Sequence, residues 1–269
     1  MRLTSDSARS TIARRVLVVA GTLLFATSSL GAQDPAPPKI GSDFIIPFSS
    51  AYLLAGRLNA DPSMINAHFA RPDLPNGTGF SALSNDAYAI GLGGYFPVSR
   101  VLLGFEAYYA DLGYETSPTG KTNDGEMAYG MAMVGLPVYT SWRLTVFPYL
   151  GLGAGTMRVS LKNRDGGPTV SLSKSPTFDE IILSPGTDSQ ILGNYFMVQP
   201  GLGVDYLVLK DDASSHLGVT FGFRFGSAIT PNRTQWKYRG KEVFGGPTFQ
   251  PSGTTLRVLV GIGGFRMAR

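Results

Sequence analysis

The chain has 269 residues, of which 34 are glycine and none is cysteine. The lack of cysteine excludes disulfide bonds, a thiolate metal site and a lipid-modified cysteine anchor. The formal net charge is +4, but residues 1–32 contain four arginines and one aspartate and so account for +3 of it. The rest of the chain is close to neutral, which argues against a nucleic-acid partner.

The amino terminus has the pattern of an export signal. Several arginines precede an apolar run at 16–25, and small residues follow it up to Ala32. This run is shorter than the roughly 20 residues of a transmembrane helix. We predict a cleaved secretory signal peptide at 1–32, an extended proline-containing linker at 33–42 and one domain at 43–269. The alternative is a buried amino-terminal helix.

Alternation of side chains with a period of two recurs through the domain and predicts β-strands. Eight segments show it, at 44–55, 87–96, 101–114, 127–139, 144–155, 194–208, 217–226 and 254–265, and a continuation of the fifth segment to 162 is left open. The clearest alternation lies between Leu144 and Gly155. The weakest segment is the first, in which Pro47 and Ser50 interrupt a face that carries Phe44, Ile46, Phe48, Tyr52 and Leu54.

The two faces of these segments differ in a way that favours a membrane barrel. One face carries large apolar residues, and the other carries mostly glycine and polar residues. A soluble barrel or sandwich would place its large apolar residues inside and polar residues outside. We therefore predict an all-β, eight-stranded antiparallel up-and-down transmembrane barrel, whose large apolar residues face lipid.

Charged and polar residues within the strands share the face of the glycines. An arginine facing lipid at mid-membrane costs about 2–4 kcal/mol, so these residues are expected to point into the lumen. The predicted lumen network consists of Glu106, Gln199, Asp205, Arg224 and Arg257. Counting back from the turn at 210–215 places Gln199 opposite Arg224. The network either fills the lumen as a structural plug or lines a gated ion path.

The predicted connections alternate between long and short, as in bacterial outer-membrane barrels with long outer loops and short periplasmic turns. Together with the leader and the eight strands, this pattern resembles the small OmpA/OmpX-type barrels of the porin-like superfamily, over about residues 40–265. The resemblance implies a Gram-negative outer-membrane location, a monomer, and contact with outer-membrane lipid, lipopolysaccharide and the assembly machinery. In such barrels a terminal aromatic residue directs assembly. Phe265 is the nearest match here, although Arg266–Arg269 follow it.

One outer loop has a basic and aromatic segment that could contact lipopolysaccharide phosphates. The candidate residues are Arg233, Trp236, Lys237, Tyr238, Arg239 and Lys241. If the segment extends a strand above the membrane, Lys237, Arg239 and Lys241 lie on one face. The alternative is a solvated strand edge whose charges prevent aggregation.

The sequence leaves two other functions open, acyl chemistry on lipid A and a small pore. Some barrels that resemble this chain modify the acyl chains of lipid A with a histidine, a serine and a carboxylate. Here His68 lies in an outer loop, and its candidate partners are Ser63, Ser81, Asp73, Asp86, Asp188 and Ser189. They form no recognisable motif, so no catalytic residue is assigned. A small pore would become feasible if part of 163–193 added two strands. We expect no cofactor and no metal site, and we expect Asn123–Gly125 to form a turn.

Overall fold

The computed structural model describes residues 39–40, 44–45, 48–71, 73–74, 77–141, 143–163, 176–183, 188–209, 217–231, 234–249 and 253–264. The predicted signal peptide, most of the predicted linker, the turn at 210–215 and Phe265 lie outside these residues. None of the helices in the described part of the chain is long and apolar enough to cross a membrane.

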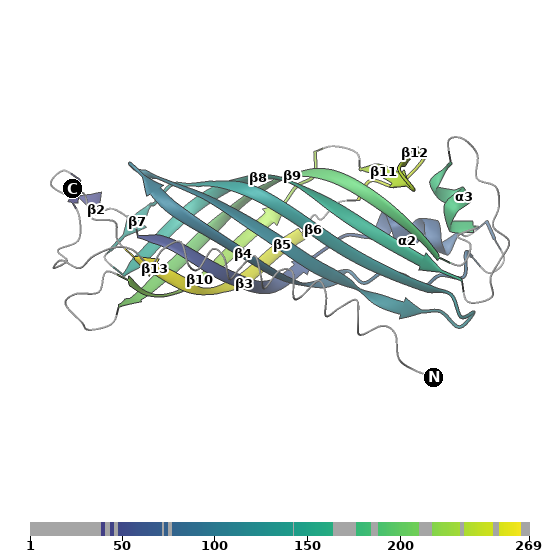
Figure 1. The fold of residues 1–269 in the computed structure, drawn as a ribbon, viewed down its shortest axis with the longest axis horizontal. Helices are drawn as coiled ribbons and strands as arrows, with labels where there is room; N and C mark the ends of the chain where they lie inside the picture. The colour runs from purple at the N-terminus through teal and green to yellow at the C-terminus, as the bar shows by residue number, and fades with distance from the viewer. Residues whose placement is uncertain are drawn as a thin grey trace.

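Eight long strands form a closed ring (Figure 1). They are β3 (Ser49–Asn59), β4 (Asp86–Val98), β5 (Val101–Thr116), β6 (Thr122–Gly135), β8 (Leu144–Lys162), β9 (Asp188–Leu209), β10 (Leu217–Ala228) and β13 (Gly253–Gly264). Each strand pairs antiparallel with the next in the chain, and β13 pairs with β3 to close the ring. The predicted eight-stranded antiparallel up-and-down barrel is confirmed.

Short helices and strands lie at the two ends of the barrel. The helices α2 (Ser63–Ala70) and α3 (Phe178–Leu183) and the hairpin of β11 (Gln235–Tyr238) and β12 (Lys241–Val243) gather at one end, which we call the loop end (Figure 1). The opposite end, which we call the turn end, has the β4–β5 turn at Ser99–Arg100 and the short strand β7 (Tyr139–Thr140). A separate pair, β1 (Lys39–Ile40) and β2 (Phe44–Ile45), lies outside the ring.

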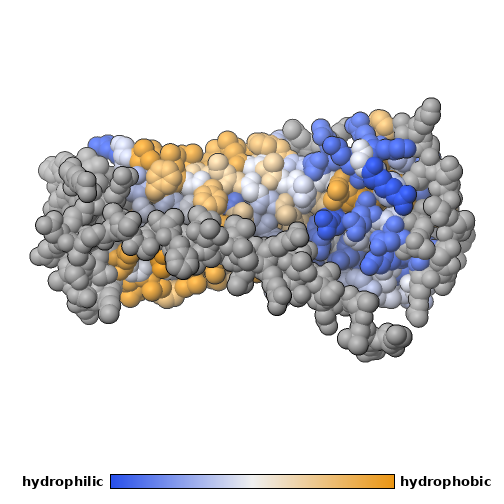
Figure 2. Space-filling view, viewed as in Figure 1, coloured by the Kyte–Doolittle hydropathy of each residue, from blue (hydrophilic) through white to orange (hydrophobic). Residues whose placement is uncertain are grey.

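The outer wall carries an apolar belt on the side of the turn end, and polar residues cover the loop end (Figure 2). On β8, the outward-facing residues are apolar from Leu144 to Ala154 and polar from Thr156 to Lys162. This apolar stretch is about 33 Å long at ~3.3 Å per residue. At a strand tilt of about 40° it would span roughly 25 Å, the height of a membrane-facing band.

The prediction for the first strand is wrong in both its limits and its facing. The strand begins at Ser49, and Phe44 belongs to the separate β1–β2 pair. Tyr52 and Leu54 do share a face, but that face is buried in the lumen, whereas Leu53 is exposed. Tyr52 fits inside because β4 offers Gly93, where a Cβ would lie 2.8 Å from the Tyr52 ring. Aromatic side chains can therefore occupy the lumen wherever neighbouring strands contribute glycine.

Several predicted loops are strands instead. The connection between the third and fourth segments is shorter than predicted. Strand β5 continues as far as Thr116 and β6 already begins at Thr122, so only residues 117–121 connect them. The Asn123–Gly125 segment therefore lies within β6 and is not a turn. Similarly, β9 begins at Asp188, six residues before the predicted start at 194. The outer faces of these extensions are mostly polar, with Leu192 as an exception, so hydrophobic alternation alone does not reveal them.

Candidate functional site

The centre of the lumen holds a buried pair of opposite charges. Arg224 on β10 and Asp205 on β9 are both fully buried, and Arg224 Nη2 donates to Asp205 Oδ2 at 2.9 Å. Arg224 faces Arg257 directly across the β10–β13 pairing. Like charges in such positions destabilise a sheet, so this arrangement requires compensating carboxylates.

Glu106 supplies the compensation from the opposite wall of the barrel. This residue lies on β5, four strands from β10 around the ring. Glu106 Oε2 accepts a hydrogen bond from Arg257 Nη1 at 3.2 Å, and Glu106 Oε1 lies 3.5 Å from Arg224 Nε. The contact is possible because an eight-stranded lumen is only wide enough for side chains. Two arginines and two carboxylates thus meet in one neutral cluster.

Gln199 belongs to the same cluster, but it is not opposite Arg224 as predicted. The β9–β10 register places Gly203 there, and Gln199 faces Gly151 on β8. The prediction fails because it was counted from a turn whose geometry the sequence does not fix. Gln199 Nε2 donates to Tyr149 Oη at 3.2 Å, and Arg257 Nη2 donates to the same oxygen at 2.8 Å. The structure therefore brings all five predicted lumen residues into one connected network.

Aromatic residues complete this network, although none of them belongs to the predicted lumen network. Tyr52 Oη donates to Glu106 Oε1 at 2.9 Å, and Tyr108 donates to the other oxygen of the same carboxylate. The guanidinium carbon of Arg224 lies 4.9 Å from the ring centre of Phe147, within cation–π range. The sequence does indicate that Tyr108 belongs to the lumen, because it lies two residues from Glu106 on the same strand and so shares its face.

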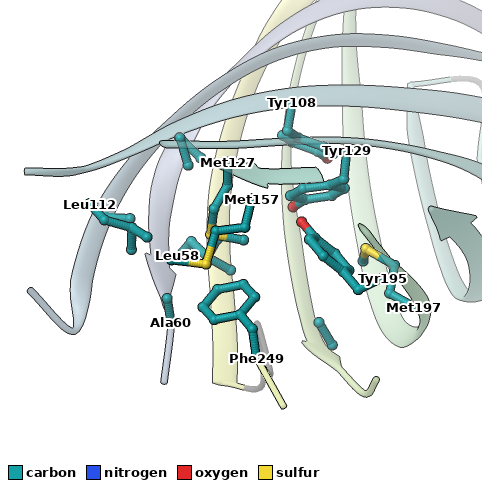
Figure 3. Close-up of a cluster of buried hydrophobic side chains, with 14 of the residues drawn as sticks. Leu58, Ala60, Tyr108, Leu112, Met127, Tyr129, Met157, Tyr195, Met197 and Phe249 are labelled. Atoms are coloured by element: carbon teal, nitrogen blue, oxygen red, sulfur yellow. The ribbon is translucent and has the colours of Figure 1, made fainter. Parts of the chain in front are cut away.

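Buried apolar side chains form a second layer in the lumen, between the charged cluster and the loop end. Figure 3 shows part of this apolar layer. Its side chains come from strands on different sides of the ring and from the segment that follows β12. They include Leu58, Leu112, Met127, Tyr129, Met157, Tyr195, Met197 and Phe249, all buried. The helices α2 and α3 add Ile65, Phe69, Phe178, Ile181 and Ile182 to the same buried cluster. Toward the loop end, the described part of the lumen is thus filled by a charged layer and this apolar layer.

The basic segment forms a hairpin joined to the edge of β9. Strand β11 pairs with Ile191–Asn194 of β9, and β12 pairs with β11. Lys237, Arg239 and Lys241 are exposed, whereas Trp236 and Tyr238 are buried. Of this segment, these cations are therefore exposed and the two aromatic residues are not, and the contact with lipopolysaccharide stays a prediction. Successive residues of β11 face opposite sides, so Trp236 and Tyr238 face the barrel and Lys237 faces away from it. Arg233 lies outside the described residues.

Trp236 anchors this hairpin to the end of the barrel. Its indole Nε1 donates to the carbonyl of Pro247 at 2.6 Å, and its ring centre lies 5.1 Å from that of Phe178 in α3. Tyr238 Oη lies 3.0 Å from Ser189 Oγ on β9. The exposed cations are therefore presented on a hairpin that is held from below by buried aromatic residues.

His68 has a carboxylate partner that the sequence analysis missed. Its Nδ1 lies 2.6 Å from Asp179 Oδ1 in α3, and Asp179 also pairs with Arg71. The predicted partner Asp73 instead pairs with Arg71, whose hydrogen bond lowers the pKa of the Asp73 carboxyl below its ordinary value. The predicted partner Asp86 pairs with Arg57.

No serine hydroxyl is among the contacts of His68 within the described chain, which are Asp179 and the ring of Phe178. The described residues also include no group of three or more potential metal ligands. A nucleophile, base and carboxylate are therefore not assembled around His68 in the described residues.

No family model matches the chain, and no curated protein matches it. Among solved structures, it is similar to Neisserial surface protein A (NspA), with a TM-score of 0.39 and 12% identity over 81% of this chain and 96% of that one. It is also similar to a major outer membrane protein from Thermus thermophilus, with a TM-score of 0.39 and 9% identity over 80% of this chain and 98% of that one. At these values the function has to be argued from the residues of this chain itself.

Proposed function

We propose that this chain is an outer-membrane barrel with a closed lumen, which anchors a basic hairpin at the cell surface and contacts lipopolysaccharide through it. The observation that carries the proposal is the lumen network, in which Glu106, Asp205, Arg224 and Arg257 are all at most 1% exposed. A gated ion path needs water beside its charges, whereas these charges are buried and paired with one another and with tyrosines.

The apolar belt supports the membrane location. Exposed phenylalanine, leucine and valine side chains lie along β10 and β13, including Phe221, Phe223, Leu256 and Val258. A contiguous exposed apolar surface of this kind is rare on soluble proteins and is expected in contact with lipid. The loop end then lies outside the cell, since long loops are external in such barrels. Export by the predicted signal peptide at 1–32 belongs to the same proposal.

The exposed cations of the hairpin support the contact with lipopolysaccharide. Lys237, Arg239 and Lys241 lie beyond the apolar belt, at the level expected for phosphorylated headgroups. Ammonium and guanidinium groups donate strong hydrogen bonds to phosphate oxygens. Because the contact is electrostatic, it should weaken as salt concentration rises.

Two measurements test the proposal. Planar bilayers that contain the purified barrel should show no steady conductance. In the second measurement, immobilised barrel should retain lipopolysaccharide at low salt, and Lys237→Gln/Arg239→Gln/Lys241→Gln should retain much less. Regular single-channel steps would refute the closed lumen, and unchanged retention by the triple variant would refute the role of the hairpin.

One observation favours a second candidate function, acyl chemistry on lipid A. The contact between His68 and Asp179 orients an imidazole at the loop end, as a general base requires. Mass spectrometry of lipid A from cells with wild-type protein and with His68→Ala decides between the two functions. We expect identical acyl chains, because no nucleophile is assembled beside this histidine in the described residues. A change in acyl number that disappears in His68→Ala would establish the enzyme instead.

A further inference from the structure

A groove hollows the outer wall of the barrel where the apolar belt meets the polar loop end. It has a volume of about 680 Å³ and is lined by β5, β6, β8, β9 and Gln235 of β11. This volume lies within the range of roughly 300–1,000 Å³ that is typical of small-molecule sites. Its lining is mostly apolar and combines the small residues Ala107, Ala128, Gly130 and Ala154 with the aromatic residues Tyr108, Tyr129, Tyr195 and Phe196.

Strand register explains why the wall is hollow at this place. Ala107, Gly130 and Ala154 are direct neighbours across β5, β6 and β8, and all face outward. Two residues nearer the turn end, Phe105 and Leu152 project from the same strands with about half of their surface exposed. The small residues therefore form a depression bordered by large side chains on its membrane side.

A charged row lies on the other side of the groove, two residues nearer the loop end. The register places Glu126, Arg158, Leu192 and Lys237 side by side across β6, β8, β9 and β11. Arg158 Nη1 lies 3.2 Å from Glu126 Oε2, and Tyr109 Oη donates to Glu126 Oε1 at 2.9 Å. Glu126 thus holds the Arg158 guanidinium above the groove.

The spacing of the two cations suits a single phosphate. Arg158 and Lys237 flank Leu192, so their backbones are two strand spacings, or about 10 Å, apart. Both side chains are long enough to converge on one anion between them. Thr156, Asn194 and Gln235 line the groove on the side of these cations and provide neutral hydrogen-bonding groups.

We propose that this groove binds one acyl chain of a phosphorylated outer-leaflet lipid, lipopolysaccharide, with a lipid A phosphate held between Arg158 and Lys237. This inference rests on the proposed membrane location and orientation. The order of the features matches that of the lipid, because the apolar groove lies toward the membrane and the cations lie above it. A second copy of the chain fits less well, since a two-fold pair in the membrane would bring the same cations of both copies together.

The test is native mass spectrometry of the purified full barrel released from detergent. The probes are lipid A with its phosphates, the same lipid A after removal of the phosphates, and phosphatidylethanolamine. Ala128→Phe fills the groove, and Ala132→Phe is its matched control on the same face of β6, outside the groove lining. Arg158→Gln removes the cation, and Lys162→Gln is its control on the same face of β8.

Wild-type barrel should retain phosphorylated lipid A at least about tenfold more tightly than either other lipid. Ala128→Phe and Arg158→Gln should each remove most of this preference, while both control variants should keep it. Equal retention of lipid A by Ala128→Phe and wild type would overturn the proposed lipid site. So would a lipid-free dimer of the wild-type barrel that Ala128→Phe converts to monomer, because the groove would then bind a second copy of the chain. If only Arg239→Gln/Lys241→Gln lost binding, the proposed groove site would be refuted. The proposed contact between the hairpin and lipopolysaccharide would still stand.

Discussion

Arg224 shows how one lumen residue depends on its neighbours. It lies opposite a second arginine, under three aromatic rings, and within reach of two carboxylates. Burying a guanidinium is costly, and the cost is offset only while its partners stay in place. The cluster therefore contributes specificity of register, because a shift of one residue would turn Arg224 toward lipid.

Arg224→Met should destabilise the barrel by about 3–5 kcal/mol, because it leaves the buried Asp205 carboxylate without its cation. Urea titration of the folded band on a cold gel measures the change. Arg57→Met is the control, since Arg57 also pairs with an aspartate but is exposed, and it should change little. Asp205→Leu/Arg224→Met should recover much of the loss, because Glu106 still neutralises Arg257. Equal stability of Arg224→Met and wild type would refute the lumen assignment.

Two glycines that face opposite sides of the barrel wall, Gly222 on β10 and Gly130 on β6, allow a second test. A Cβ at Gly222 would overlap Asp205 Oδ1 in the lumen, whereas a Cβ at Gly130 would meet only the Glu106 carbonyl oxygen at 3.9 Å. Gly222→Ala should therefore cost about 1–3 kcal/mol through overpacking, and Gly130→Ala should be tolerated. The same urea titration measures both variants. The interpretation fails if the two substitutions have equal effects.

The β11–β12 hairpin extends the barrel wall by pairing with the free edge of β9 beyond the membrane belt. Short strands of this kind are marginal by themselves. The buried ring of Trp236 and its hydrogen bond to Pro247 supply the anchor. The cations on the hairpin are thereby held at a fixed height above the apolar belt.

Trp236→Ala should release this hairpin and leave the barrel closed. Removing a buried tryptophan typically costs about 3–5 kcal/mol, and here the loss falls on contacts with α3 and Pro247. Trypsin should then cut at Lys237, Arg239 or Lys241 in folded barrel, where wild type resists. Lys237→Gln, which leaves Trp236 in place, serves as the control. Resistance of Trp236→Ala to trypsin would show that the hairpin is held by other contacts.

The closed ring makes the whole molecule one cooperative unit, since every long strand is paired on both sides. A barrel without free edges in its membrane belt keeps its shape in cold detergent. We therefore expect faster migration of the unboiled protein in SDS than of the boiled protein. A periplasmic protein with equal migration before and after boiling would contradict both the membrane facing and the proposed function.

The strand pattern could be predicted wherever apolar residues recur at every second position of the outer face, as on β8 and β13. It failed on β3, where Tyr52 faces the lumen, because the sequence of one strand does not show the glycines of its neighbours. The partner of His68 was missed for a similar reason. Asp179 lies 111 residues away, in a helix that no alternation pattern predicted.

The sequence by itself determined the number of strands, their direction and the facing of most side chains. These properties follow from the alternation of neighbouring residues and from connection lengths, which are local. Only the tertiary structure decided that Glu106 joins both arginines, that Trp236 points inward and that small residues align into a groove. Those contacts depend on the stagger of strands around the closed ring, which brings together residues that are distant along the chain.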